Sequence, residues 1–303
     1  MVYLSEFSLP TREKEDLFFD STRNPNFKTK NFRTVYSSKY PFDLFRDREL
    51  PTFEFSDITI FCGNNGSGKS TILNVISETL GLKRGTVFNK SDFFGDYLEL
   101  CNYEYADKSI KAPPRDSMII TSDDVFERVL STRRLNDGID DRRNELISEY
   151  ITARDPDLVN QLNGLDDYER WSKTAALRKK RLTQSSYIRQ NLMGNVQERS
   201  NGESALAYFV EMVQDNALYL LDEPENSLSP QNQLQLKYFI EDSVRNHGCQ
   251  FIISTHSPFI LSLRRAKIYD LDMIPPMETP WTELENVRTY FEFFEEYRDD
   301  FTE

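Results

Sequence analysis

The sequence has no long hydrophobic run and few of the residues that bind transition metals. No stretch contains the roughly 18 consecutive apolar residues of a membrane-spanning helix. There are two histidines, His247 and His256, and three widely spaced cysteines, Cys62, Cys101 and Cys249, without a C-x-x-C pair. We therefore expect reduced cysteines, and neither a disulfide framework nor a histidine-rich metal centre.

A secretory signal and an excess of positive charge are absent as well. The first residues carry no basic start followed by an apolar stretch, so we expect a cytoplasmic protein with no membrane insertion. The 37 Lys and Arg are outnumbered by 50 Asp and Glu. The resulting formal net charge of −13 disfavours general adhesion to nucleic acid or anionic lipid.

A contact with nucleic acid, whether DNA or RNA, must therefore be local. The segment 171–192 is a candidate because it holds six basic residues and no acidic one. These basic residues are Lys173, Arg178, Lys179, Lys180, Arg181 and Arg189. The competing interpretation is a solvated helix face that pairs with an acidic neighbour.

What the sequence does have is a complete phosphate-binding loop of the pattern G-x-x-x-x-G-K-[ST]. The apolar run 58–62 predicts a strand before the loop, and the apolar spacing over 70–80 predicts a helix after it. In this setting backbone N–H groups and the helix N-terminus face phosphate oxygens. Lys69 is expected to reach the β and γ phosphates, and the Ser70 hydroxyl to bind Mg²⁺. The loop and the residue after it are Gly63, Asn64, Asn65, Gly66, Ser67, Gly68, Lys69, Ser70 and Thr71.

Residues suited to metal binding and proton transfer also follow two later predicted strands. The strand 217–221 ends in Asp222 and Glu223, at the edge where open α/β sheets bind ligands. Asp222 suits Mg²⁺, and Glu223 suits accepting a proton from the water that attacks the γ phosphate. His256 follows the strand 250–254 and is predicted to contact the γ phosphate and orient this water.

A second candidate anion site lies just before the acidic strand. Ser200 and Gly202 precede a predicted helix over 205–213, where they present a hydroxyl and free N–H groups. In the two-lobed arrangement they cannot serve the phosphate held by Lys69 of the same chain. We therefore expect a homodimer in which these residues of one subunit close on ATP held by the other. The competing interpretation is a simple helix cap.

The succession of these elements predicts an α/β fold, a P-loop NTPase with a mixed or parallel sheet core. Short β-like runs at 2–7 and 53–62 predict an antiparallel N-terminal edge. Over 124–214 the composition changes to alternating acidic and basic residues with helical spacing, which predicts an inserted helical lobe. The nucleotide-binding core is then formed by 1–123 and 215–303.

These motifs, in this order, resemble the ATP-binding-cassette superfamily, and within it the short bacterial ATPases related to SMC and recombination-repair proteins. The resemblance covers 58–82 and 198–271 and leaves the helical lobe outside. It implies a signature motif that acts across the dimer, a dimer-spanning loop, a metal and a base carboxylate, and a switch histidine. The residues at these positions are Ser200, Gly202 and Glu203 for the signature, Ser227, Leu228 and Ser229 for the loop, Asp222 and Glu223 for the carboxylates, and His256 for the switch.

The chain also departs from the family pattern. Arg199, Asn201 and Glu203 replace residues of the usual signature L-S-G-G-Q, and Ser229 replaces the usual Asp of the dimer loop. The range 122–124 stands where transporters place a coupling glutamine, and it contains none. These differences bear on the hydrolysis rate and on transmembrane coupling more than on nucleotide binding.

The sequence thus predicts an Mg²⁺-dependent ATPase that forms an ATP-driven homodimer. The resemblance and the basic segment favour DNA repair or anti-phage defence with a separate nuclease or effector. The alternatives are the ATPase subunit of a membrane transporter and a nucleotide-gated interaction module with little turnover. Support for the last comes from the acidic, aromatic stretch 281–301, which is either a helix docked on its own core or a partner-binding surface.

Overall fold

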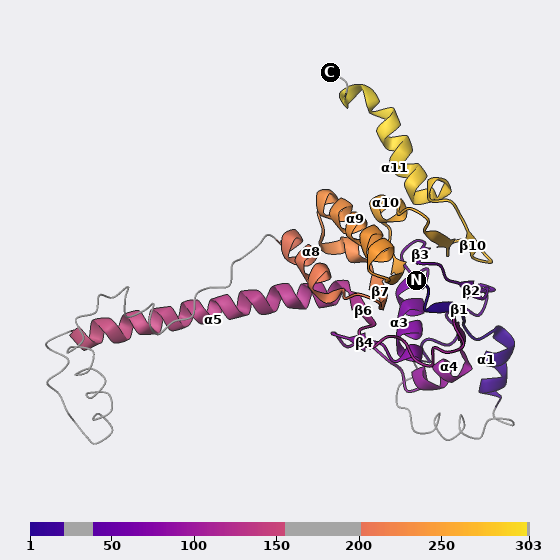
Figure 1. The fold of residues 1–303 in the computed structure, drawn as a ribbon, viewed down its shortest axis with the longest axis horizontal. Coiled ribbons are helices and arrows are strands. Elements are labelled where there is room, and N and C mark those ends of the chain that lie inside the picture. Colours follow the sequence, from indigo (N-terminus) through magenta and orange to yellow (C-terminus); the bar gives the residue numbers. More distant parts are fainter. Residues whose placement is uncertain (21–38, 155–200, 302–303) are drawn as a thin grey trace. The chain divides into compact units, whose positions relative to one another are not determined.

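The computed structural model describes residues 1–20, 39–154 and 201–301, and the chain divides into two units. The first unit consists of Met1–Phe126 with Asn201–Glu303, and the second of Glu127–Ser200. The first is built around a mostly parallel sheet flanked by helices (Figure 1). This architecture confirms the predicted α/β fold class.

The second unit is shorter than the predicted lobe 124–214. Helix α8 (Asn201–Met212) belongs to the first unit because Ala205 and Phe209 are buried in its core beside Leu236 of α9. Helix α5 (Ser122–Arg154) begins in the first unit and continues through the described part of the second.

The central sheet of the described chain has seven strands in the order β10-β9-β3-β8-β7-β6-β4. All neighbouring pairs are parallel except β10 and β9. The strands are β3 (Ile58–Cys62), β4 (Lys83–Arg84), β6 (Met118–Thr121), β7 (Leu218–Asp222), β8 (Gln250–Ser254), β9 (Lys267–Asp270) and β10 (Met277–Glu278). Because β3, β8 and β7 are parallel neighbours, the phosphate loop, the acidic pair and His256 all start at one edge of the sheet.

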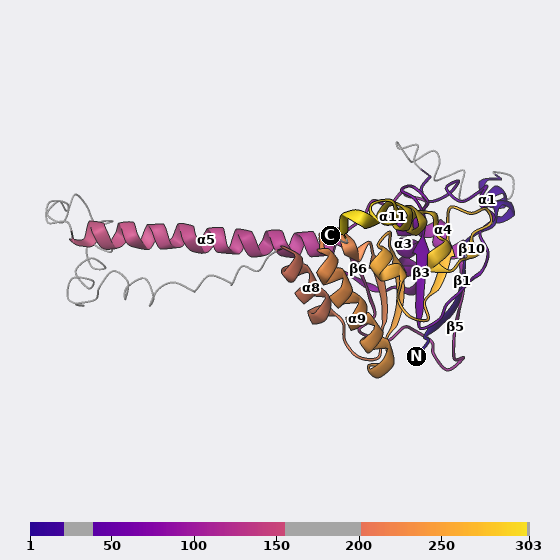
Figure 2. The same ribbon diagram turned by 90° about the horizontal axis from the view of Figure 1, so that it is seen from above.

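Helices cover both faces of this sheet because its buried strands present apolar side chains alternately to each side. Leu220 and Ile252 share one buried cluster with α3 (Lys69–Leu80). Leu221 and Ile253 share the other with α8 and α9 (Pro230–Asn246). Figure 2 shows α8 and α9 on the side of the strands away from α3.

A smaller antiparallel sheet forms the predicted N-terminal edge. Its central strand β1 (Leu4–Ser8) pairs with β2 (Phe53–Glu54) and with β5 (Asn102–Tyr105). Helices α1 (Arg12–Phe19) and α4 (Phe94–Leu100) accompany it. The buried side chain of Gln250 joins the two sheets.

Gln250 makes four hydrogen bonds across this junction. Its Oε1 accepts from the backbone N–H groups of Tyr3 and Leu4 at 2.8 and 3.0 Å. Its Nε2 donates to the carbonyl oxygens of Leu4 and Ser56 at 2.9 and 3.0 Å. All polar atoms of the buried amide are thereby satisfied.

The aromatic stretch near residue 290 is not packed on the core. After η2 (Trp281–Glu283), helix α11 (Glu285–Glu296) buries only Val287, beside the buried Leu284 that precedes it. The six aromatic side chains that follow are between 44% and 72% exposed; they are Tyr290, Phe291, Phe293, Phe294, Tyr297 and Phe301. The interpretation of a helix docked along its length on its own core is therefore wrong.

Among the described residues, no helix combines the length and the apolar character that crossing a membrane requires. The three cysteines are free, with Cys62 and Cys249 buried and Cys101 partly buried.

Candidate nucleotide site

The phosphate loop turns tightly between β3 and α3 because its glycines adopt conformations that other residues avoid. Gly66 and Gly68 have φ angles of 83° and 99°, in the left-handed region. A Cβ atom on Gly68 would lie 2.4 Å from a ring carbon of the buried Phe45. This loop position therefore requires glycine both for its backbone and for its contact with the ring.

Lys69 is the centre of the site. Its side chain is only 4% exposed, and its Nζ donates to the Gly63 carbonyl at 2.8 Å. The same nitrogen lies 2.7 Å from His256 Nε2 and 3.9 Å from Glu223 Oε1. Burial lowers the pKa of the Lys69 ammonium, and the charge of Glu223 opposes this change.

Ser70 and Asp222 form a second pair beside it. The Ser70 hydroxyl donates to Asp222 Oδ1 at 2.9 Å, and the Ser254 hydroxyl donates to the same oxygen. Burial raises the pKa of Asp222, whereas these two hydrogen bonds favour its charged form.

The oxygens of Ser70 and Asp222 match the type and the number of protein ligands that Mg²⁺ usually has. Mg²⁺ prefers hard oxygen ligands and usually takes one or two from the protein, with water and substrate phosphates completing its shell. Among the described residues no cluster of three or more His, Cys, Asp or Glu could hold a metal ion.

Glu223 and His256 come from neighbouring strands and face each other. Glu223 Oε1 lies 3.6 Å from His256 Nε2, and Glu223 Oε2 accepts from Asn226 Nδ2 at 2.9 Å. The Glu223 backbone has a φ of 47°, an uncommon value for a residue with a side chain. Burial and the nearby ammonium of Lys69 lower the pKa of His256, which favours the neutral imidazole.

Two residues that the sequence analysis did not single out hold the His256 peptide. Glu225 Oε1 accepts from the backbone N–H of His256 at 2.6 Å and from that of Ser257 at 3.2 Å. Asn286, in the first turn of α11, donates to the His256 carbonyl at 3.1 Å. The extra Glu in the run Asp222-Glu223-Pro224-Glu225 is the only signal for this role in the sequence.

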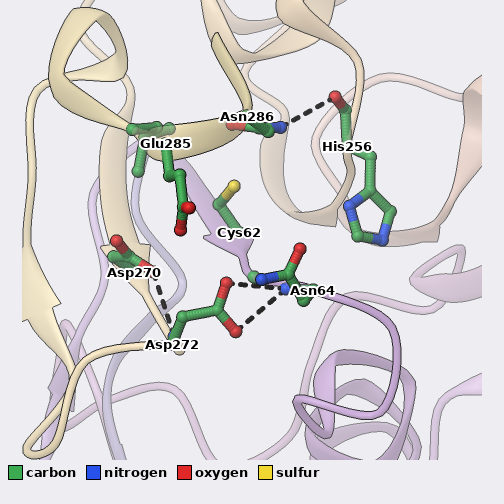
Figure 3. Close-up of a pocket in the computed structure, with 9 residues that line it drawn as sticks. Cys62, Asn64, His256, Asp270, Asp272, Glu285 and Asn286 are labelled. Carbon is green, nitrogen blue, oxygen red and sulfur yellow. Dashed lines mark hydrogen bonds between the residues drawn. The ribbon is translucent and has the colours of Figure 1, made fainter. Parts of the chain in front are cut away.

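A second unforeseen contact is made by the segment after β9. The Asp272 carboxylate accepts from the backbone N–H of Asn64, at 2.8 and 2.9 Å to its two oxygens (Figure 3). Both residues line a small cavity of about 30 Å³, together with Cys62, His256 and Glu285. A negative charge therefore sits directly against the phosphate loop.

Several residues that the sequence predicted for the site do not join the cluster around Lys69 or lie outside the described residues. Ser200 and the basic residues of 171–192 lie outside the described residues. Gly202 and Glu203 lie in the first turn of α8, of which only the backbone is described. Ser229 accepts from the Asn232 N–H as the N-cap of α9, and the backbone of Ser227 ends η1 (Pro224–Ser227).

Two protein-family models match parts of the chain. A family model described as ABC transporter matches residues 52–226, which is more than half of the chain. A second model, described as AAA ATPase domain, matches residues 199–261.

One curated relative is the uncharacterized ABC transporter ATP-binding protein MJ0089 of Methanocaldococcus jannaschii. It is 29% identical over 205 residues, which are 66% of this chain. The match spans 65% of the length of that relative.

Solved structures that match the chain include an Smc head domain and an ATP-binding cassette. The Smc head domain derived from Pyrococcus furiosus, with an extended coiled coil and bound to the C-terminal domain of ScpA, is 15% identical with a TM-score of 0.44; the match covers 98% of this chain and 100% of that one. The cassette MJ0796, in a dimeric post-hydrolysis state bound to ADP and Pi, is 13% identical with a TM-score of 0.35, covering 75% of this chain and 88% of that one.

The ABC transporter model extends over the phosphate loop and the acidic pair Asp222 and Glu223, the residues that the structure brings together. The chain therefore belongs to the ABC transporter family of ATPases.

Proposed function

We propose that this chain binds Mg-ATP, dimerises around it and hydrolyses it, and that hydrolysis releases the dimer. The observation that carries this proposal is the meeting of Lys69 with His256 at 2.7 Å and with Glu223 at 3.9 Å. Glu223 and His256 closely follow the ends of β7 and β8, and Lys69 begins α3 after the loop that follows β3, the parallel neighbour of β8. Such convergence at one sheet edge is what an in-line attack on a bound phosphoryl group requires.

Each side chain has a separate task in this scheme. The Lys69 ammonium and the loop N–H groups stabilise the charge that develops on the transferred phosphoryl group. Glu223 accepts the proton of the attacking water, and neutral His256 orients that water through a hydrogen bond. Ser70 and Asp222 would hold Mg²⁺, which supplies charge neutralisation at the β and γ phosphates when bound.

The second subunit completes the site in this proposal. Ser200 and Gly202 of the partner would approach the γ phosphate from the side opposite Lys69, so neither copy forms a finished site alone. Closure of the dimer would then depend on ATP, and loss of the γ phosphate would release it.

The test is the oligomeric state of Glu223→Gln with and without saturating Mg-ATP. This variant keeps the shape of the side chain and loses the base, so we expect a stable ATP-bound dimer and little turnover. Lys69→Ala is the matched control that should neither bind ATP nor respond to it. If Glu223→Gln shows tight ATP binding and no nucleotide-dependent association by light scattering, the dimer cycle is wrong.

A role on DNA, in repair or anti-phage defence with a separate effector, is the partner proposal that the basic segment 171–192 supports. Binding through phosphate contacts should weaken steeply as salt is added. Reversing Arg178 and Lys179 to Glu should lower both the affinity and the salt slope. Unchanged binding in this variant, or none by the wild type at low ionic strength, would remove the DNA proposal and leave the ATPase cycle intact.

A further inference from the structure

The chain before β2 contacts the phosphate loop and the first turn of α3 at several points. The Tyr40 hydroxyl donates to Thr71 Oγ1 at 3.1 Å. The buried ring of Phe45 lies so close to Gly68 that no Cβ atom fits between them. A turn closed by the Arg48 N–H, which donates to the Phe45 carbonyl at 3.0 Å, brings the Arg48 side chain to the same loop. The loop is therefore packed on a segment that carries no part of its motif.

Arg48 connects the loop to the end of the central sheet. Its Nη1 donates to the Ser67 carbonyl oxygen at 3.0 Å and to the Leu271 carbonyl oxygen at 3.1 Å. Leu271 is a fixed point, because its side chain is buried and its N–H donates to the carbonyl of Cys62, the last residue of β3, at 2.8 Å. Hydrogen bonds from a charged guanidinium are stronger than those between neutral groups. The Ser67 carbonyl is thus tied to the sheet through one side chain.

The bond to Ser67 also sets the direction of a phosphate-binding group. The cis peptide bonds of the described chain precede Pro41 and Pro275, so the peptide between Ser67 and Gly68 is trans. In a trans peptide the C=O and the N–H point in opposite directions. Because Arg48 holds the carbonyl on one side, the Gly68 N–H points to the other. Loop N–H groups bind phosphate in this motif, so Arg48 sets the direction of one of them from outside the motif.

The stretch after β9 holds a second peptide of the loop. The Asn64 N–H donates to the Asp272 carboxylate at 2.8 and 2.9 Å (Figure 3). Asp272 directly follows Leu271. The same stretch therefore holds the loop at Asn64 directly and at Ser67 through Arg48. The shape of the loop is fixed at both places before any nucleotide is bound.

We propose that Arg48 is a positioning residue for ATP binding, which holds the phosphate loop in the shape that receives the β and γ phosphates. The proposal rests on the proposed function, ATP binding at the Lys69 loop, and adds a residue that lies outside the loop motif. A loop that is already ordered loses less conformational freedom when the ligand binds, so the affinity is higher. Arg48 acts through the loop backbone, and its effect belongs to the binding of ATP more than to the chemical step.

The first test is the ATP affinity of the full chain, measured by titration calorimetry. Arg48→Met keeps the aliphatic length of the side chain and removes the guanidinium, and we expect the ATP dissociation constant to rise at least ~tenfold. At saturating ATP, kcat should stay within about threefold of the wild type, because bound phosphates then order the loop. Arg12→Ala is the matched control, since its guanidinium pairs with the exposed Asp47 at 3.4 Å instead of the loop. The affinity of this control should be unchanged.

Two comparisons exclude other roles for Arg48. If only its charge attracted ATP, the advantage of the wild type over Arg48→Met would vanish at about 500 mM salt, whereas a loop held by hydrogen bonds keeps it. If the aliphatic stem supported the loop by packing, Arg48→Ala would weaken ATP binding and Arg48→Met would not. Either result would overturn the proposal, as would a fall in kcat with unchanged ATP affinity.

Hydrogen exchange of the nucleotide-free protein tests the loop itself. The Asn64 N–H donates to Asp272, and the Ser67 N–H donates to the Asn64 carbonyl at 3.0 Å, so a peptide that covers both amides reports on loop order. In Arg48→Met this peptide should exchange at least ~tenfold faster than in the wild type. A peptide from α9 should keep its rate and show that the fold is kept. Unchanged exchange of the loop would contradict the role of Arg48. The measurement needs no ATP, so it still decides whether Arg48 orders the loop if the wild type binds no ATP and the proposed function fails.

Discussion

Glu225 accepts a hydrogen bond of 2.6 Å from the backbone N–H of His256, and this contact fixes where the imidazole stands relative to Lys69. Asn286 donates a hydrogen bond to the carbonyl oxygen of His256. His256 is thus positioned through its peptide groups by Glu225 and Asn286. Their effect on catalysis should therefore pass through the histidine.

Removing the Glu225 acceptor should slow turnover without weakening nucleotide binding. Glu225→Ala leaves the His256 N–H without its partner, and we expect kcat to fall ~10- to 100-fold while the ATP dissociation constant changes less than about threefold. Glu225→Gln retains an oxygen acceptor and should recover most of the rate. Steady-state kinetics with a parallel binding titration checks this, and an equal loss in both variants would point to general unfolding of the site.

The same carboxyl should give the protein a measurable pH dependence of stability. Burial raises the pKa of Glu225 above its ordinary value of 4.5, although the hydrogen bonds that its carboxylate accepts, including the one from the His256 N–H, oppose this rise. A raised pKa means that the folded state keeps its proton to higher pH than the unfolded state does. The stability that this group contributes is therefore present below about pH 4.5 and is lost as pH rises through the folded pKa.

Glu225→Gln removes this titration and should be more stable than the wild type at pH 7.5. The advantage should shrink as pH falls toward 4.5, where Glu225 itself becomes neutral. Thermal unfolding of both proteins across this range measures the difference. A constant offset at all pH values would show that the carboxyl is not titrating between the two states.

Gly68 should tolerate no side chain. Gly68→Ala places a Cβ 2.4 Å from the Phe45 ring at a φ of 99°, so the loop must shift or strain. We expect ATP affinity to fall by about two orders of magnitude or more, since the loop N–H groups no longer converge on phosphate. Gly95→Ala, where an added Cβ meets nothing within 4 Å, is the matched control and should bind ATP normally. Equal ATP affinity in the two variants, measured by titration calorimetry, would contradict the steric argument.

Gln250 should be important for stability and irrelevant to nucleotide chemistry. Its replacement by Leu removes four hydrogen bonds at the junction of the two sheets, three of them buried, and takes away the acceptor of the Tyr3 and Leu4 N–H groups. We expect a loss of about 2–4 kcal/mol in the free energy of unfolding, measured in urea. The exposed Gln214→Ala should change it by less than about 0.5 kcal/mol.

The sequence predicted the parts of this molecule that follow from local pattern. The strand before Gly63 and the helix after Lys69 were predicted because apolar periodicity and a complete phosphate motif agree there. The sequence also predicted that Glu223 and His256 lie at the same edge of the sheet, because each follows a strand of a parallel βαβ succession.

What the sequence could not predict depends on contacts between distant residues. Asp272 contacts Asn64 and Asn286 contacts His256, but Asp272 and Asn286 lie in segments that carry no motif of their own. The amphipathic pattern of α11 is equally compatible with a core helix and with an exposed one. Only the path of the chain after Leu284 decides between them.

Asp272 supplies a last prediction, because it places a carboxylate against the loop that must hold a triphosphate. Its oxygens accept from the Asn64 N–H at 2.8 and 2.9 Å, so it both orders the loop and opposes a second anion nearby. Asp272→Asn keeps an acceptor and removes the charge, and we expect ATP affinity to rise several-fold at low salt. Asp272→Ala removes the acceptor as well and should bind ATP less tightly than Asp272→Asn. Titrations at about 50 and 500 mM salt distinguish the two effects. Added salt screens the repulsion between the Asp272 carboxylate and ATP, whereas the hydrogen bond to the Asn64 N–H is unaffected. An Asn variant that binds ATP more weakly than the wild type at both salt concentrations would show that the carboxylate acts through loop order alone.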